Sequence, residues 1–162
     1  MQTEHAAQRA KPRALANTAM FMGVIVALLI GYRVLFGGSA TVPTPEVFAG
    51  QTDLREAMSR GQASGRPVFA MATADWCGPC QALKAGALAD ERVVALLRER
   101  TEPVYIDVDR NPRDAESLGV RSIPALFILS PTGEPIAQTV GNASADTLLQ
   151  WVSAAVGDDG AR

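Results

Sequence analysis

The feature that most constrains this chain is the segment Ala74-Asp75-Trp76-Cys77-Gly78-Pro79-Cys80, which contains its only two cysteines. The apolar run 67–72 before it is typical of a buried strand, and the strong helix formers at 81–85 after it are typical of a helix. Cys77 is therefore expected at a helix N-terminus, where free N–H groups and the helix dipole favour negative charge. Such a position lowers the pKa of a thiol and activates it as a nucleophile.

The spacing of the two cysteines also fits half of a zinc site. Structural zinc sites usually have four ligands, but the chain has no second cysteine pair, and its single histidine, His5, lies in a polar tail. We therefore expect no metal and no other cofactor. Pro79 suits the first turn of a helix, where its missing N–H costs nothing, and Gly78 leaves the approach to Cys77 uncrowded. The pattern indicates a redox-active dithiol.

Three separate motifs resemble the thioredoxin family. Trp76-Cys77-Gly78-Pro79-Cys80 matches its active site, Arg121-Ser122-Ile123-Pro124 resembles the segment that carries its cis-proline, and residues 107–112 resemble its central strand and following turn. Residues 74–77 and 89–93 are especially similar to the C-terminal domain of the DsbD membrane reductant conduit.

The resemblance implies a thioredoxin-like α/β fold, with a mixed central sheet flanked by helices. The residue patterns alone support only the α/β class. They predict strands at 68–73, 104–108, 125–129 and 136–140, and helices near 52–60, at 81–85, after Asp90, near 113–118 and from Ser144. The charged stretch 98–102 is expected to be a solvated helix end.

The resemblance also implies roles for individual residues. Cys77 and Cys80 would be the catalytic pair and form the redox-active disulfide. The substrate would be bound by a surface made of Trp76, Gly78, Pro79, Ile123 and Pro124. A cis Pro124 would turn the backbone of Ile123 toward Cys77, and an ordinary trans proline at the start of a strand is the alternative. Trp76 would pack against the domain, form an apolar wall beside Cys77, or do both.

One position departs from the family pattern. Thioredoxins typically carry a buried aspartate six residues before the first active-site cysteine, and here that residue is Met71. A lysine that usually neighbours the aspartate is matched by Tyr105. A buried carboxylate can accept a proton from the resolving cysteine, and its charge raises the pKa of a nearby thiol. We expect both effects to be absent here.

The N-terminal region predicts a membrane anchor. Residues 14–32 carry no charge, and the span 17–36 is long enough to cross a bilayer as one transmembrane helix. Three basic residues precede the span and only Arg33 lies at its end, so the basic tail 1–16 is expected in the cytoplasm. A cleaved signal peptide with a site near 38–40 is the alternative.

Both N-terminal readings export the rest of the chain. After the span we expect a linker at 37–46, a thioredoxin-like domain at 47–157 and a short tail at 158–162. The net charge of −2 gives no indication of a nucleic-acid partner. The predicted location is the bacterial inner membrane, with a single pass and the domain on the periplasmic or other extracytoplasmic side.

The sequence thus predicts a membrane-tethered thiol-disulfide oxidoreductase. The Gly78-Pro79 pair is the same as in thioredoxin and favours a reductase, whose substrates would be exported proteins that contain disulfides. The DsbD-like features imply a membrane reductant conduit as its electron donor. Two alternatives remain open: an exported oxidase or isomerase, and a non-catalytic module that uses the dithiol for metal delivery or binding.

Overall fold

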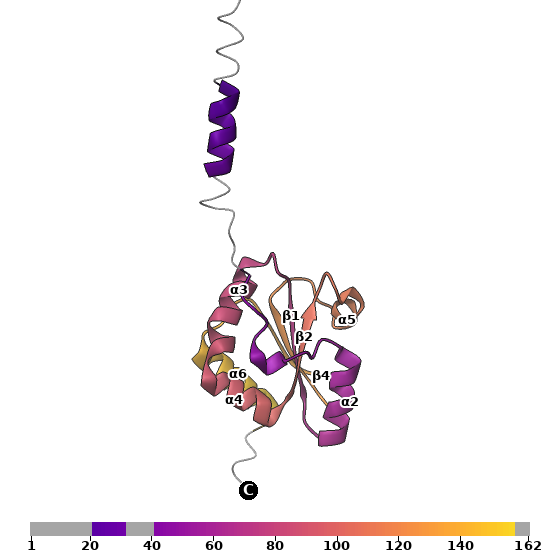
Figure 1. Ribbon diagram of the computed structural model, residues 1–162. Helices are drawn as coiled ribbons and strands as arrows, with labels where there is room; N and C mark the ends of the chain where they lie inside the picture. Colours follow the sequence, from indigo (N-terminus) through magenta and orange to yellow (C-terminus); the bar gives the residue numbers. More distant parts are fainter. Residues whose placement is uncertain (1–20, 32–40, 158–162) are drawn as a thin grey trace, which may run out of the picture. The chain divides into compact units, whose positions relative to one another are not determined.

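The computed structural model describes residues 21–31 and 41–157 of the chain (Figure 1). Residues 21–31 form a helix whose large apolar side chains are mostly exposed. Across the two described ranges, we find no helix that is both long and apolar enough to cross a membrane. The predicted span 17–36 extends outside the described residues at both ends, as do the predicted tails 1–16 and 158–162 and positions 37–40 of the predicted linker.

Residues 41–157 form one compact unit with the predicted alternation of helices and strands. Its elements are η1 (Glu46–Phe48), α2 (Leu54–Ser64), β1 (Val68–Thr73), α3 (Gly78–Ala85), η2 (Ala87–Ala89), α4 (Glu91–Arg100), β2 (Glu102–Asp107), α5 (Pro112–Ser117), β3 (Ala125–Leu129), β4 (Pro135–Val140) and α6 (Ala145–Val156). The predicted helix starts are confirmed at three places, where the side chains of Asp53, Asp90 and Ser144 accept a hydrogen bond from the first turn.

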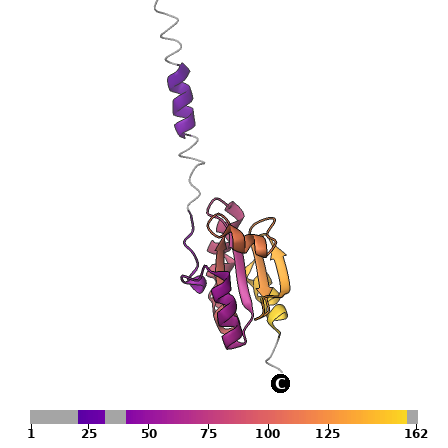
Figure 2. The ribbon, with the colours of Figure 1, turned by 90° about the vertical axis from the view of Figure 1, so that its right-hand side faces the viewer.

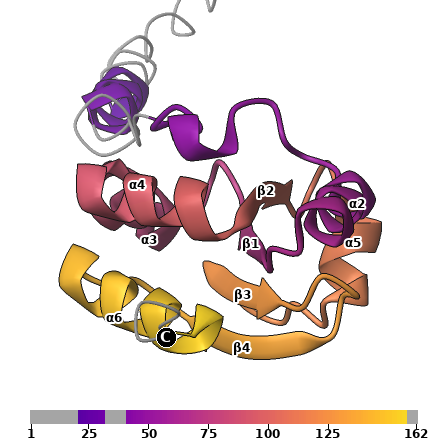
Figure 3. The same cartoon turned by 90° about the horizontal axis from the view of Figure 1, so that it is seen from below.

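The four strands form a mixed sheet in the order β2-β1-β3-β4. β1 pairs with β2 in parallel and with β3 antiparallel, and β4 continues the sheet antiparallel to β3. Helices α3, α4 and α6 cover one face, and α2 and α5 cover the other (Figures 2 and 3). All six side chains of β1 are buried, which explains why its sequence is a continuous apolar run without alternation.

The two faces of β1 belong to different parts of the core. Phe69 and Met71 pack under α3, α4 and α6, whereas Val68, Ala70 and Ala72 pack under α2 and α5. β1 is therefore held on both sides where it ends at Thr73, and the active-site segment begins directly after it. The sheet and its two helix layers thus fix the position of the cysteines.

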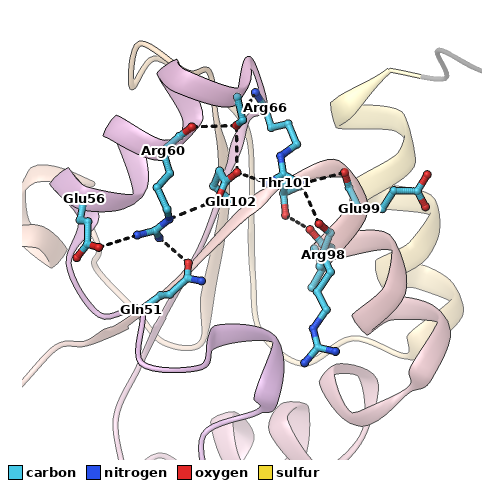
Figure 4. Close-up of polar contacts among 10 residues, drawn as sticks. Gln51, Glu56, Arg60, Arg66, Arg98, Glu99, Thr101 and Glu102 are labelled. Atoms are coloured by element: carbon cyan, nitrogen blue, oxygen red, sulfur yellow. Dashed lines mark hydrogen bonds and ion pairs between the residues drawn. The ribbon is translucent and has the colours of Figure 1, made fainter.

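The charged stretch 98–102 differs from its prediction as a solvated helix end. Thr101 and Glu102 are buried, because β2 begins at Glu102 and runs directly into the interior. The Glu102 carboxylate accepts hydrogen bonds from Arg60, Ser64 and Arg66 (Figure 4). Burial raises the pKa of this carboxyl, but the hydrogen bonds from these three residues outweigh burial and hold the pKa below its ordinary value.

Arg66 also connects this buried carboxylate to the end of α4. Its guanidinium donates to the carbonyls of Arg98 and Glu99, at 3.0 and 3.3 Å (Figure 4). These carbonyls belong to the last turn of α4, where a helix leaves its C=O groups without internal partners. One arginine therefore joins the start of β1, the start of β2 and the end of α4.

Candidate active site

The two cysteines form a disulfide in the turn between β1 and α3. The S–S distance is 2.09 Å and the two Cα atoms lie 5.2 Å apart. Cys77 is 4% exposed and Cys80 is fully buried. Cys77 is thus slightly more exposed than Cys80, which lies in the first turn of the helix.

Cys77 is the N-cap residue of α3, as the sequence predicted. Its backbone is extended, and its Sγ accepts a hydrogen bond from the backbone N–H of Cys80 at 3.2 Å. Pro79 occupies the first turn, where it removes no hydrogen bond. On reduction, the same N–H group and the positive end of the helix dipole face the Cys77 sulfur and stabilise its thiolate.

The segment that resembles the cis-proline region lies against the disulfide. The Ile123–Pro124 peptide bond is cis, as the resemblance implied. Ile123 and Val108 pack against a small buried cluster formed by Ala74, Cys77 and Cys80. Three parts of the chain that are far apart in sequence therefore meet at the cysteines, and the assignment of Ile123 and Pro124 to substrate binding stays a prediction.

Trp76 forms an exposed apolar surface next to Cys77. It is 68% exposed, so it contributes little to the core, and its indole N–H donates to Asp109 Oδ2 at 2.8 Å. Gly78 lies beside it, and a Cβ atom at that position would meet no atom within 4 Å. The glycine is therefore not required by packing inside the domain, and the surface in front of it is open.

An ion-pair network missed by the sequence reasoning joins the two loops beside Trp76. Arg110 pairs with Asp75, which precedes Trp76, at 3.2 Å, and with Asp107 at the end of β2 at 3.0 Å. Asp107 also accepts the backbone N–H of Asp109 at 2.9 Å. Asp109, which accepts the hydrogen bond from the Trp76 indole, is thus attached to the end of the buried strand β2.

Gln81 is a second site residue that sequence reasoning missed. Its side-chain amide donates to the carbonyl of Asp75 at 3.0 Å and to that of Ala74 at 3.4 Å. Its Oε1 accepts the backbone N–H of Val42 at 2.7 Å. Gln81 therefore ties the segment before Cys77 to the active-site helix and to residue 42, which the sequence placed in a linker.

The interior beneath α3 differs from the thioredoxin pattern in the way the sequence predicted. Met71 is fully buried and lies opposite Tyr105 in the pairing of β1 with β2. The Tyr105 hydroxyl accepts a hydrogen bond from Lys84 Nζ at 3.4 Å. A lysine is therefore present in this region, but it comes from α3, and its burial was not predicted.

Comparison with known proteins agrees with this geometry. Residues 54–155 match the family described as thioredoxin-like domain. Thioredoxin from Chlamydia muridarum is 40% identical over 83 residues, which cover 49% of this chain and 74% of that protein. The solution structure of a thioredoxin from Thermus thermophilus has a TM-score of 0.56 and 26% identity, and covers 62% of this chain and 81% of that one.

A further similar structure is that of a DsbH oxidoreductase. It has a TM-score of 0.56 and 17% identity, and covers 76% of this chain and 96% of that one. At this identity the likeness concerns the fold alone. The cysteine pair, the helix N-terminus and the sequence relatives together make the described domain a thiol-disulfide oxidoreductase.

Proposed function

The chain belongs to the thioredoxin-like domain family, and from this membership we propose that it is an exported, membrane-tethered reductase of protein disulfides. The observation that carries the proposal is the position of the Cys77–Cys80 disulfide at the N-terminus of α3, with Cys77 as the outer sulfur. The exchange step needs an attacking thiolate and a second thiol behind it, and the order of Cys77, at 4% exposure, and the fully buried Cys80 suits these two roles.

The reaction proceeds in two exchanges. The Cys77 thiolate attacks one sulfur of a substrate disulfide, which forms a mixed disulfide and releases one substrate thiolate. Cys80 then loses its proton and attacks Cys77 Sγ, which closes the Cys77–Cys80 disulfide and releases the second substrate thiolate. Two electrons pass from the dithiol to the substrate, and the released thiolates take up protons according to their pKa values.

The residues between the cysteines favour electron flow from this protein to its substrate. Gly78 and Pro79 are the pair found in thioredoxin, whose midpoint potential of about −270 mV makes it a reductant. The exposed Trp76 surface and the open space in front of Gly78 suit an extended segment of a protein substrate. We therefore propose disulfide-containing exported proteins as substrates, bound along Trp76, Gly78, Pro79, Ile123 and Pro124.

The N-terminal region supports the proposed membrane tether. The helix at 21–31 exposes eight large apolar side chains, and the sequence carries no charge between positions 14 and 32. Arg9, Lys11 and Arg13 precede this region, which favours a cytoplasmic N-terminus. An exported reductase works in an oxidising compartment, so it requires an electron donor. We propose a membrane reductant conduit for this role.

Three measurements test the proposal. The reduced protein should reduce insulin, and its midpoint potential against glutathione should lie below about −200 mV. A value near the −120 mV typical of DsbA, or no insulin reduction, would contradict a reductase. A phosphatase reporter fused after Arg162 should be active, because it requires an oxidising compartment. An inactive phosphatase fusion beside an active cytoplasmic reporter would overturn the proposed orientation.

A further inference from the structure

Lys84 is a buried positive charge on the active-site helix. It lies in the last turn of α3, is only 2% exposed, and belongs to the largest fully buried side chains of the domain. Burial of an ammonium group is costly unless it is paired with a negative charge or fully hydrogen-bonded. The partners of Lys84 therefore indicate whether its charge is neutralised within the domain.

Both hydrogen-bond partners of the Lys84 ammonium are neutral. Nζ donates to the carbonyl of Val42 at 3.0 Å and to the Tyr105 hydroxyl at 3.4 Å, and it lies 5.8 Å from the centre of the tyrosine ring. Within residues 41–157, no carboxylate lies within 4 Å of it. Lys84 lines a pocket between α3, α4 and the segment 42–46, and Glu46 and Glu91 line it too. Glu46, however, pairs with Arg98 at 3.7 Å, and Glu91 is exposed.

Lys84 lies one helical turn after Cys80 on α3. Residues four apart are neighbours on a helix, and both Cys80 and Lys84 are buried. A long side chain in a helix also leans toward the N-terminal turn. Val42 fixes this direction, because its carbonyl accepts from Lys84 while its N–H donates to Gln81 Oε1 at 2.7 Å. The charge is thus held beside the residue that follows Cys80.

The charge of the cysteine pair changes during the reaction, whereas the charge of the lysine is held in place. The disulfide is neutral. Uptake of two electrons and two protons converts it to two thiol groups, and one of these then releases its proton to solvent and becomes a thiolate. A nearby cation favours the thiolate over the thiol and over the neutral disulfide. With Met71 in place of a carboxylate, no negative charge at that position offsets this effect.

We propose that the positive charge of Lys84 stabilises the reduced, thiolate form of the Cys77–Cys80 pair. It acts through the electrostatic potential at the sulfurs and does not contact the substrate. Val42 and Tyr105 hold its ammonium group in place from outside the active-site turn. The inference rests on the dithiol exchange of the proposed function, but not on its membrane location or its substrates.

The test is the equilibrium of each purified variant with reduced and oxidised glutathione. Lys84→Met removes the charge but keeps an unbranched apolar side chain, so the domain should remain folded. Its equilibrium should shift roughly three- to tenfold toward the disulfide, where tenfold corresponds to about 30 mV for a two-electron couple, and the pKa of Cys77 should rise. Lys84→Arg keeps the charge, so its equilibrium should lie closer to that of the wild type than to that of Lys84→Met on a logarithmic scale.

Arg98→Met is the matched control, because Arg98 lines the same pocket and carries the same charge, but its side chain is 53% exposed. It should change the glutathione equilibrium by less than about 1.5-fold. A folded Lys84→Met variant that stays within this range, or an equal shift in Arg98→Met, would overturn the inference. Because this equilibrium uses no protein substrate, its outcome is independent of whether the wild-type protein reduces insulin.

Discussion

Met71 lies directly opposite Tyr105 in the parallel pairing of β1 with β2, at the two positions where thioredoxins typically carry an aspartate and a lysine. Met71 is fully buried and Tyr105 nearly so. The interior beneath the cysteines therefore holds a thioether and a phenol at these positions instead of an ion pair. The consequences for the thiols and for stability can be measured separately.

Substitution of Met71 by aspartate should change both the chemistry and the stability. The new carboxylate should raise the pKa of Cys77 by about one unit and speed the attack by Cys80, because it can accept the proton of that thiol. The free energy of unfolding should fall by about 2 kcal/mol, because a charge is buried. Thiolate absorbance, stopped-flow exchange and urea unfolding measure the three effects.

The control for this substitution is Met71→Asn, which is polar but uncharged. It should lower stability without raising the thiol pKa or speeding resolution. If Met71→Asp left the pKa and the rate unchanged, another group would supply the base, or the site would not need one.

Loss of the Gln81 side chain should loosen the segment before Cys77. Gln81→Ala removes the contacts with Asp75 and Val42 and leaves their backbone groups without these partners, at a cost of about 1–2 kcal/mol in the free energy of unfolding. Insulin reduction should slow as well. Gln62→Ala, on the exposed side of α2, is the matched control. Equal stability of the two variants would show that the Gln81 contacts contribute nothing.

The hydrogen bond between Trp76 and Asp109 should matter for large substrates. Asp109→Ala removes the only acceptor found for the indole N–H in the described residues and frees the ring. We expect KM for a protein disulfide to rise about fivefold, which corresponds to about 1 kcal/mol, while reduction of a small disulfide changes less than twofold. Asp109→Asn, which keeps an acceptor oxygen, should be close to wild type. Equal loss with both substrate sizes would indicate damage to the sulfurs themselves.

Glu102 should make the domain sensitive to acid. Its folded-state pKa lies below its ordinary value of 4.5, so the unfolded chain binds more protons than the folded one between these two pKa values. The stability that Glu102 contributes is therefore complete above about pH 4.5 and is lost as the pH falls through the folded-state pKa. Urea unfolding at a series of pH values measures this slope, which is the change in the free energy of unfolding with pH.

Glu102→Gln should reduce the slope, and Glu99→Gln, at an exposed position of α4, should leave it unchanged. Some slope should remain in Glu102→Gln, because the side chain of Arg92 also holds the pKa of Asp90 below its ordinary value. A profile identical to that of the wild type would show that the Glu102 contacts do not contribute to stability.

Local sequence patterns predicted the elements around the site well. The bounds of β1 and β3 and the caps at Asp90 and Ser144 follow from apolar runs and capping residues, which act over a few positions. The thioredoxin resemblance added the cis peptide before Pro124, which no local pattern could have shown.

The residues that sequence reasoning missed all act over long distances. Gln81 and Lys84 look like ordinary helix formers, and their roles depend on Val42, about 40 positions earlier. Glu102 looks like part of a charged surface, and its burial depends on Arg60 from α2 and Arg66 from the loop between α2 and β1. Sequence periodicity cannot predict such contacts, because they form only when the sheet and helices pack together.

The central claim is that Cys77 attacks the substrate and Cys80 resolves the mixed disulfide, and trapping with Cys80→Ser tests it most directly. In cells, this variant should accumulate covalent complexes with other proteins that disappear on treatment with a thiol reductant. The complexes should be absent from the double variant Cys77→Ser/Cys80→Ser. If Cys77→Ser instead trapped the partners and Cys80→Ser trapped none, the assignment of attacking and resolving cysteine would be wrong.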